Sequence, residues 1–589
     1  MSDTASNTLL AYITKGLILP VTFSIQWPKW TMLAILVMGI LAPVVTGLGE
    51  TTRAAFGILP VLGKHDFNLT AWQQLFQLPG FTTSLQLTLV SGFLATSTGL
   101  ILTIFGCAWV YNTSEKSFLF SKLKPFIAPM LVPILAAPHA AIAIGLTFLL
   151  APSGWLTRLF SPWLTTWQLP PNLTIVQDLW GLSLTLGLIV KELPFLWLIS
   201  LVALKQINLS KQLSIAQSMG YSYANAWYKI IIPQLYPLIR LPVLVVLVYA
   251  LSTVDMALIL GPNTPPTLAL ATMRWYNDAN VAMLLPASAA AIGLAGLMIL
   301  SVFVWEIAIV IIMAVTKIAT RSGARGRHWR LVSTALATAL PMSLLLGFLS
   351  LVVLLIWSFT WRWSFPDALP TSWSYSYWLK LITHWPLALQ HSIILALGSS
   401  AIAVIFAVAW LEVQDRFGGY LSRLTLWFIY LPLLVPQIAF LYGLKVGFLR
   451  IGLNGGMGAV IWAHLLFVFP YVMLSLIDSW RAIDRRYLQV AASLGTSTWG
   501  CFWRIKLTLL LQPLLLAWAI GIAVSIGQYL PTLMIGAGKI ETLTTQAVSL
   551  ASGADRRLVG VYGLIQALVP ILAYMLAIYL PRLMALKKL

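Results

Sequence analysis

The sequence predicts an all-α polytopic membrane protein with about twelve transmembrane helices, arranged as two parallel repeats of six. Three observations support this fold class: the apolar composition, the regular spacing of apolar stretches, and a loop pattern that occurs twice. Of the 589 residues, 59% are hydrophobic and 9% are charged, and the mean hydropathy is +0.89. A water-soluble domain cannot cover so much apolar surface, so we expect the chain to lie in a lipid bilayer.

Apolar stretches of about 20 residues, the length that crosses a bilayer as a helix, occur along the whole chain. They lie near 30–49, 83–111, 126–151, 179–204, 240–261 and 284–316, and again near 335–360, 391–411, 424–449, 458–478, 512–536 and 558–581. Residues 1–316 are therefore expected to form a first half and 335–589 a second. An even number of spans gives both halves the same orientation, related by a pseudo-two-fold axis along the membrane normal.

The charge distribution predicts the orientation. The net charge is +20, and most Lys and Arg residues fall in loops on one side of the predicted spans, as in cytoplasmic loops. Both termini and the repeated loops 210–233 and 484–508 are therefore expected in the cytoplasm, and residues 317–334 are expected to form a basic cytoplasmic linker. Because this rule accounts for the positive charge, no nucleic-acid partner is expected.

The repeated loop is the most specific pattern in the chain. Its glycines, Gly220 and Gly495, lie 275 positions apart (495 − 220 = 275). Leu, Ala, Ser, Ser and Ile recur in register at 213/488, 216/491, 218/493, 222/497 and 230/505. Each copy is predicted to form two short helices separated at the glycine, which suits a left-handed residue. Ser210 and Asp484 are the expected N-caps.

This spacing resembles the EAA loop of ATP-binding-cassette importer permeases, in which E-A-A is followed three residues later by Gly and nine later by I-x-L-P. The sequence departs from the motif at Ser214, Gln489 and Thr508. In that family the loop docks on a cytoplasmic ATPase. The resemblance implies this role for Ala216, Gly220, Ile230, Pro233, Ala491, Gly495, Ile505 and Leu507.

The resemblance also implies a fold and partners. The chain is similar to fused two-half permeases of the type I importer fold, such as those for thiamine and ferric iron. A thiamine-like or other small cationic solute, or ferric iron, is then the expected cargo. The expected partners are two copies of a cytoplasmic ATP-binding subunit and a periplasmic or extracellular solute-binding protein, at a bacterial inner membrane. The outer segments 261–268 and 536–543 match one another and are candidate contacts for that binding protein.

Catalytic chemistry is not expected in this chain. The sequence contains no G-x-x-x-x-G-K-[ST] motif for holding phosphates, so ATP hydrolysis is assigned to a separate subunit. The six His residues show no zinc-ligand spacing. We therefore expect no catalytic residues, no metal site and no cofactor.

Ionisable residues within membrane spans are costly and indicate function. Glu192 and Asp255 lie in predicted spans and would suit a cationic solute. Alignment of the two helices that follow the repeated loops pairs Ser252 with Ser525 and Asp255 with Gln528. These five residues are the candidate solute pathway.

Several alternatives remain open from the sequence. Lys191 would form a structural ion pair with Glu192 or Asp255, and the two serines would bond only to their own helices. His139 is expected to be a packing residue. An ion-coupled secondary transporter that uses Glu192 and Asp255 would also have about twelve spans in two parallel halves.

Overall fold

The computed structural model describes residues 27–113, 130–321, 330–383, 386–417, 423–453, 455–553 and 555–586. Within these ranges, ten helices are long and apolar enough to cross a membrane, and two further pairs of bent helices bring the number to as many as twelve. The prediction of about twelve spans is thus confirmed. The predicted linker 317–334 is helical at both described ends, and its residues 322–329 lie outside the described ranges.

The first half begins with α2 and ends with α15. Its elements are α2 (Trp27–Leu36), η1 (Val37–Leu41), α3 (Ala42–Ala55), η2 (Pro60–Leu62), α4 (Thr70–Gln77), α5 (Phe81–Thr113), a helix over residues 130–136, α7 (His139–Leu150), α8 (Trp155–Phe160), α9 (Leu182–Leu204), α10 (Leu209–Ser218), α11 (Tyr223–Ala226), η3 (Trp227–Ile231), α12 (Ile232–Ser252), α13 (Asp255–Leu260), α14 (Leu268–Tyr276), η4 (Val281–Met283) and α15 (Leu284–Arg321).

The second half repeats this order and adds a short hairpin. Its elements are α16 (Arg330–Ser358), β1 (Thr360–Arg362), β2 (Ser372–Trp373), α17 (Ser376–Thr383), α18 (Leu387–Phe417), α19 (Arg423–Leu434), α20 (Gln437–Arg450), α21 (Met457–Arg481), α22 (Arg485–Ser493), α23 (Thr498–Gly500), η5 (Cys501–Lys506), α24 (Leu507–Leu509), α25 (Leu511–Ile526), α26 (Leu530–Gly536), α27 (Leu543–Ala551) and α28 (Arg556–Leu586). Strands β1 and β2 are antiparallel.

Four stretches that the sequence predicts as continuous spans are interrupted. Residues 137–138 separate the 130–136 helix from α7, and residues 435–436 separate α19 from α20, whose axes differ by 101°. Each interruption ends in a proline, which lacks an N–H donor and disfavours helical geometry in the preceding residue. The other two interruptions, 253–254 and 527–529, fall within the spans that follow the repeated loops.

The two halves interlock. Helix α3 of the first half packs on α20 of the second, and α16 of the second packs on α7 of the first. The crossings are close because glycines meet backbone there: a Cβ atom added to Gly443 would lie 2.0 Å from the carbonyl oxygen of Gly47, and one added to Gly145 would lie 2.3 Å from that of Ser350. Small residues allow such approach in membranes, so both halves belong to one bundle.

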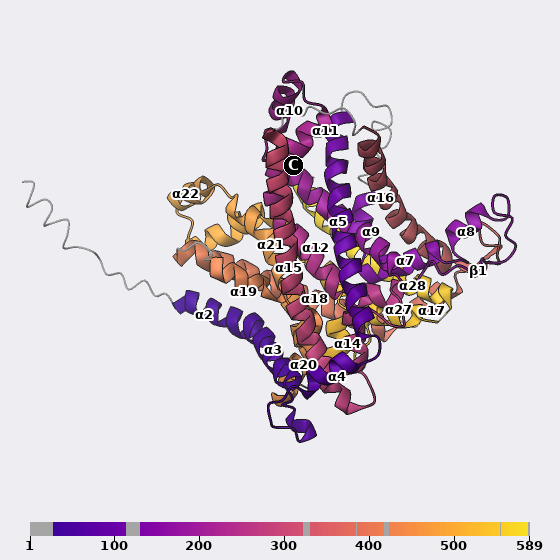
Figure 1. Ribbon diagram of the computed structural model, residues 1–589. Coiled ribbons are helices and arrows are strands. Elements are labelled where there is room, and N and C mark those ends of the chain that lie inside the picture. Colours follow the sequence, from indigo (N-terminus) through magenta and orange to yellow (C-terminus); the bar gives the residue numbers. More distant parts are fainter. Residues whose placement is uncertain are drawn as a thin grey trace, which may run out of the picture.

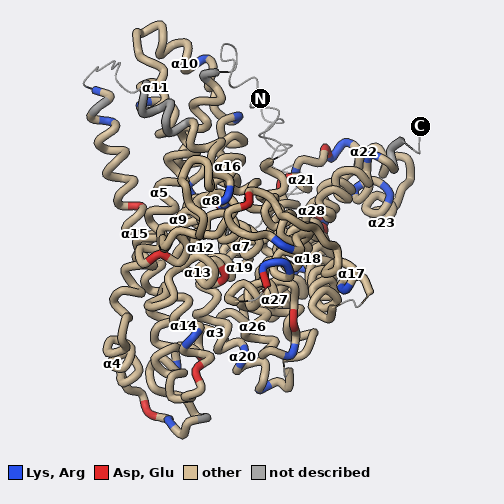
Figure 2. Tube along the Cα trace, turned by 90° about the vertical axis from the view of Figure 1, so that its right-hand side faces the viewer, with Lys and Arg blue, Asp and Glu red and all other residues tan. Residues whose placement is uncertain are grey.

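The repeated loops lie at one end of the bundle, and the segments that contain α4 and β1 lie at the other. Figure 1 shows α10 at the top and α22 at the upper left, while α4 and β1 lie at the other ends of the helices. In Figure 2, Lys and Arg residues gather around α22 and α23, and α10 carries one lysine, Lys211. The helical bodies between these ends carry few charges, as a lipid-facing surface requires.

Beside β1, a small cluster ties α17 to the start of α28. The Tyr377 phenol donates a hydrogen bond to Asp555 Oδ2 over 2.7 Å, and Arg557 Nε lies 2.8 Å from the same oxygen. Burial raises the pKa of Asp555, yet the hydrogen bonds from Arg557 and Tyr377 outweigh it and lower that pKa to about 2.

Candidate functional site

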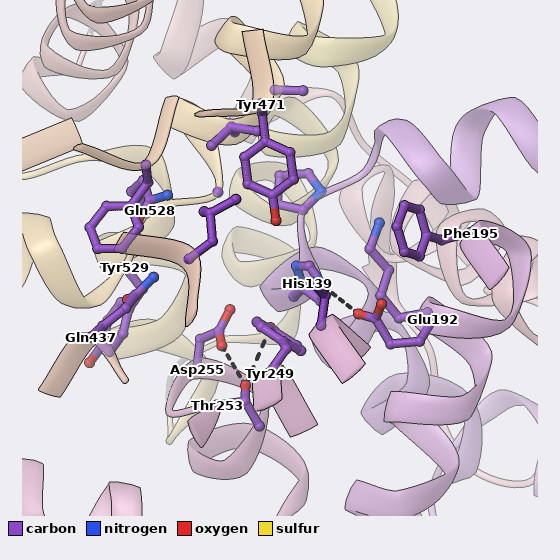
Figure 3. A pocket seen from close by; sticks show the side chains of 18 of the residues that line it. His139, Glu192, Phe195, Tyr249, Thr253, Asp255, Gln437, Tyr471, Gln528 and Tyr529 are labelled. Carbon is purple, nitrogen blue, oxygen red and sulfur yellow. Dashed lines mark hydrogen bonds and ion pairs between the residues drawn. The ribbon is translucent and has the colours of Figure 1, made fainter. Parts of the chain in front are cut away.

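A cavity of about 560 Å³ lies where the two halves meet. Figure 3 shows side chains from the first half on one side of it and side chains from the second half on the other. Its polar and tyrosine lining consists of His139, Lys191, Glu192, Tyr249, Ser252, Thr253, Asp255, Gln437, Tyr471, Gln528, Tyr529 and Tyr574. This volume falls within the usual range for sites that hold small molecules.

The four helix interruptions build much of this lining. His139 and Asp255 are the first residues of α7 and α13, and Gln437 is the first residue of α20. Gln528 and Tyr529 lie within the fourth interruption. Sequence reasoning missed His139, Gln437 and Tyr529 because it treated these spans as continuous. A signal was present, since a polar residue directly follows the proline in both Pro138-His139 and Pro436-Gln437.

Glu192 lines the cavity and is paired with His139. The Nε2 atom of His139 lies 2.9 Å from Oε1 of Glu192, and the His139 ring packs against Tyr249 with 4.5 Å between centroids. His139 therefore differs from the packing residue that the sequence predicts, because its imidazole meets a carboxylate at the cavity surface.

Asp255 also faces the cavity, and its carboxylate is held by a neutral donor. The Thr253 hydroxyl donates to Asp255 Oδ1 over 3.0 Å and lies 3.3 Å from the phenol oxygen of Tyr249. In Figure 3 the carboxylate of Asp255 points toward the space between the halves.

Lys191 does not form the ion pair that the sequence left open. The residue is 7% exposed, and its ammonium group donates to three backbone oxygens, those of Ile134 at 2.7 Å, Leu135 at 3.1 Å and Ala137 at 2.6 Å. The carbonyl groups at the end of a helix have no partner within the helix and attract cations. Lys191 thus caps the helix that ends before Pro138, and its ammonium group is hydrogen-bonded to the backbone in place of a carboxylate.

The matched serines lie in different surroundings. Ser252 lines the cavity, and its hydroxyl donates to Val248 O of its own helix over 2.8 Å. Ser525 lies outside the cavity lining, contrary to the expectation of matched positions, and is 3% exposed. It lies 2.8 Å from Nδ1 of His464, whose Nε2 lies 2.8 Å from Thr532 Oγ1. This side of α25 faces α21, so His464 braces the interruption that carries Gln528.

The two repeated loops share a left-handed glycine, and each begins its first helix with an N-cap residue. Gly220 and Gly495 both have φ of +82°, which confirms the predicted left-handed residues. Asp484 is an N-cap, with its carboxylate accepting from Arg486 N at 2.9 Å. In the first loop Asn208 occupies the N-cap position in place of the predicted Ser210, because the helix begins at Leu209.

The second part of each loop also repeats. Ser222 and Ser497 cap the short helices α11 and α23 through their hydroxyl oxygens. A π-helical turn follows in each copy, η3 in the first half and η5 in the second. In the first half η3 continues directly into α12, which ends at the interruption 253–254. In the second half η5 is followed by α24 and, after a bend of 70° at Leu510, by α25, which ends at the interruption 527–529.

The exposed face of each loop carries apolar side chains among its polar ones. Ala216 and Ala491 are buried, so they pack the loop against the bundle and do not form its outer surface. The outer surface carries two matched pairs of exposed residues, Ile215 with Val490 and Met219 with Leu494. Of the other predicted docking residues, the two glycines are exposed, and Ile230, Pro233, Ile505 and Leu507 are half-buried. Exposed apolar groups on both loops indicate a binding surface for a partner.

Comparison with known proteins gives a similarity over almost the full chain. The chain is 30% identical over 564 residues to the inner membrane ABC transporter permease protein YnjC of Escherichia coli, covering 95% of this chain and 96% of that protein. It is 24% identical over 167 residues to the spermidine/putrescine permease PotC of Escherichia coli, covering 28% of this chain and 62% of PotC. It is 30% identical over 158 residues to the molybdenum permease ModB of Mycobacterium tuberculosis, covering 25% of this chain and 60% of ModB. No family model matches the chain.

Proposed function

The chain belongs to the inner-membrane permease subunits of ABC transporters, and on that premise we propose that its central cavity carries a small organic cation into the cell. The observation that supports this proposal is the charge of the cavity. Glu192 and Asp255 face it from the first half, while the ammonium of Lys191 is occupied by three carbonyl oxygens.

The rest of the lining suits such a solute. Tyr249, Tyr471 and Tyr529 border the same space, and aromatic faces attract organic cations. The amide groups of Gln437 and Gln528 supply hydrogen bonds from the second half. A thiamine-like or polyamine-like molecule would place its charge against the acids and its remaining polar groups against the amides. Among the relatives, PotC is named for spermidine and putrescine, whereas ModB is named for molybdenum.

We propose that two copies of an ATP-binding subunit dock on the repeated loops, one on each. The matched exposed pairs Ile215/Val490 and Met219/Leu494 support two equivalent contacts. Docking of a cytoplasmic ATPase on the loops requires that both loops lie in the cytoplasm. The proposal places both termini there too, and the segments 261–268 and 536–543 then face a solute-binding protein outside. Movement of the first loop would reach the cavity through η3 and α12, and movement of the second through η5, α24 and α25.

Uptake measurements test the proposed solute class. Cells that lack the chain and cells that carry it would be compared for uptake of labelled thiamine and spermidine, with molybdate as the anionic control. We expect uptake of at least one cation to depend on the chain, to stop when ATP is depleted, and to continue when the proton gradient is collapsed while ATP is maintained. Dependence of molybdate uptake alone would refute a cationic solute, and loss of uptake with the gradient would indicate an ion-coupled carrier.

A further inference from the structure

The second repeated loop rests on an ionic cluster built around a buried lysine. Lys506, the last residue of the π-helical turn η5, is 4% exposed. Its ammonium group lies 2.8 Å from Oε2 of Glu412 and also contacts Oδ2 of Asp415. Both acids belong to α18 and are three residues apart, so they share one face of that helix. The cluster therefore joins the loop to α18.

Two tryptophans extend the cluster. The indole Nε1 of Trp480, on α21, donates to Asp415 Oδ2 over 2.8 Å, and the Lys506 ammonium lies 4.2 Å from the centre of the Trp480 ring. Arg416 Nε donates to Glu412 Oε1 over 2.6 Å, while its guanidinium lies 4.3 Å from the ring centre of Trp499. Trp499 belongs to α23, within the loop itself. Helix α18 is thus tied to the loop at two points.

In the first loop, an apolar residue stands at the position equivalent to Lys506. The repeat spacing places Ile231 at the position of Lys506 (506 − 275 = 231), and Ile231 is a fully buried residue at the end of η3. A nearby contact between this loop and a helix is made by the Tyr223 phenol, which donates to Ala108 O of α5 over 3.2 Å. The two loops therefore share a backbone plan but differ in the residue at the end of the π-helical turn.

Helix α18 leads from the cluster to the opposite end of the bundle. There the Ser392 hydroxyl accepts a hydrogen bond from Leu543 N, the first residue of α27, over 2.8 Å. Midway, α18 packs closely on α25, where a Cβ atom on Gly521 would lie 2.8 Å from Ser400 Cβ. A displacement of α18 would therefore reach both the outer segment and the helix that carries the interruption at 527–529.

We propose that Lys506 is a positioning residue that makes α18 move with the second loop when the ATPase acts. The inference rests on the proposed function, in which these loops bind the ATPase. A π-helical turn holds an extra residue and is often found at functional sites. Within such a turn, the two acids fix which residue faces α18. The second half then transmits loop movement through the charges of this cluster.

The test uses membrane vesicles that contain the full chain with the ATPase that co-purifies with it. Cys107 and Cys501 are replaced by Ala, and a single Cys at Ser252 reports on the cavity through its rate of reaction with N-ethylmaleimide. The ratio of the rates without nucleotide and with ATP plus vanadate measures the response of the cavity. We expect this ratio to fall to near one in Lys506→Met while the ATPase remains bound, and to recover in Lys506→Arg.

A triple variant tests whether the response of the cavity is lost because the cluster is absent or because the protein is less stable. Lys506→Met with Glu412→Gln and Asp415→Asn leaves Arg416 as the remaining charge of the cluster, and because Arg416 is partly exposed and lies against Trp499, we expect normal abundance and melting temperature with the response still lost. The control Arg240→Met breaks the Arg240–Glu306 pair of the first half, whose atoms are 2.9 Å apart, and should keep the response. A full response in Lys506→Met, or its return in the triple variant, would overturn the inference. A parent chain that binds no ATPase would instead refute the proposed function.

Discussion

Replacing Lys191 with Met tests how much its hydrogen bonds to the helix end beside the cavity stabilise the protein. The substitution removes the donor to the carbonyl oxygens of Ile134, Leu135 and Ala137. An unsatisfied buried acceptor costs about 1–3 kcal/mol. Ile134 is fully buried, whereas Leu135 and Ala137 border the cavity and can bond to water. Removal of a buried charge offsets part of the loss, so we expect a net destabilisation of about 2 kcal/mol.

The assay is the melting temperature of the purified full chain in detergent, together with its abundance in membranes. Lys191→Met should lower both, and Asp255→Asn should lower neither. The double variant should remain as unstable as Lys191→Met, because the structure places no bond between the two side chains. Lys445→Met is the matched control, since Lys445 is also a lysine within a span but is half-exposed. Restored stability in the double variant would refute the carbonyl cap and favour a Lys191–Asp255 ion pair.

Three further predictions concern the loops, the cavity and the outer cluster. Val at Gly220 and Gly495 forces a β-branched residue into a left-handed conformation, at a cost of more than about 1 kcal/mol each; co-purification of the ATPase should be lost, and an unchanged complex would contradict docking at the loops. Asp255→Asn should reduce uptake of the organic cation at normal abundance, while Glu306→Gln, which changes an acid outside the cavity lining, should not; equal effects would rule out a contact between Asp255 and the solute. The pKa of Asp555 is lowered to about 2 in the folded protein from about 3.9 when unfolded, so its charge stabilises the fold above pH 4 and this contribution is lost between about pH 4 and pH 2. Asp555→Asn should therefore lower the melting temperature at pH 7 more than at pH 3. A difference independent of pH would argue against this interaction.

The spans and the repeat could be predicted from the sequence because they depend on local properties. A membrane helix needs only sufficient apolar length, and a left-handed turn requires glycine, which marks Gly220 and Gly495 directly. The interruptions could not be predicted in the same way. Pro194 and Pro470 lie inside continuous helices, whereas Pro138 and Pro436 end interruptions. Neighbouring helices can satisfy the groups that a proline frees, so the outcome depends on packing that the sequence does not display.

The hydrogen-bond partners of Lys191 also could not be predicted from the sequence. Charge alone suggests that Lys191 should meet Glu192 or Asp255, but the interruption before Pro138 exposes carbonyl oxygens that bind the ammonium first. With the break known, the ammonium group of Lys191 is directed to the backbone, and the two carboxylates outnumber this one lysine in the cavity lining.

The repeat preserves backbone geometry and lets side-chain chemistry diverge. Both loops keep the left-handed glycine, the serine cap and the π-helical turn, yet Ile231 corresponds to Lys506 at the end of that turn. In the cavity, the first half supplies Glu192 and Asp255, and the second supplies Gln437 and Gln528. A cation in this site would therefore contact its counter-charges on one half alone. Since the two halves must separate or approach for access to alternate, such a solute would travel with the first half while its hydrogen bonds to the second half break and form.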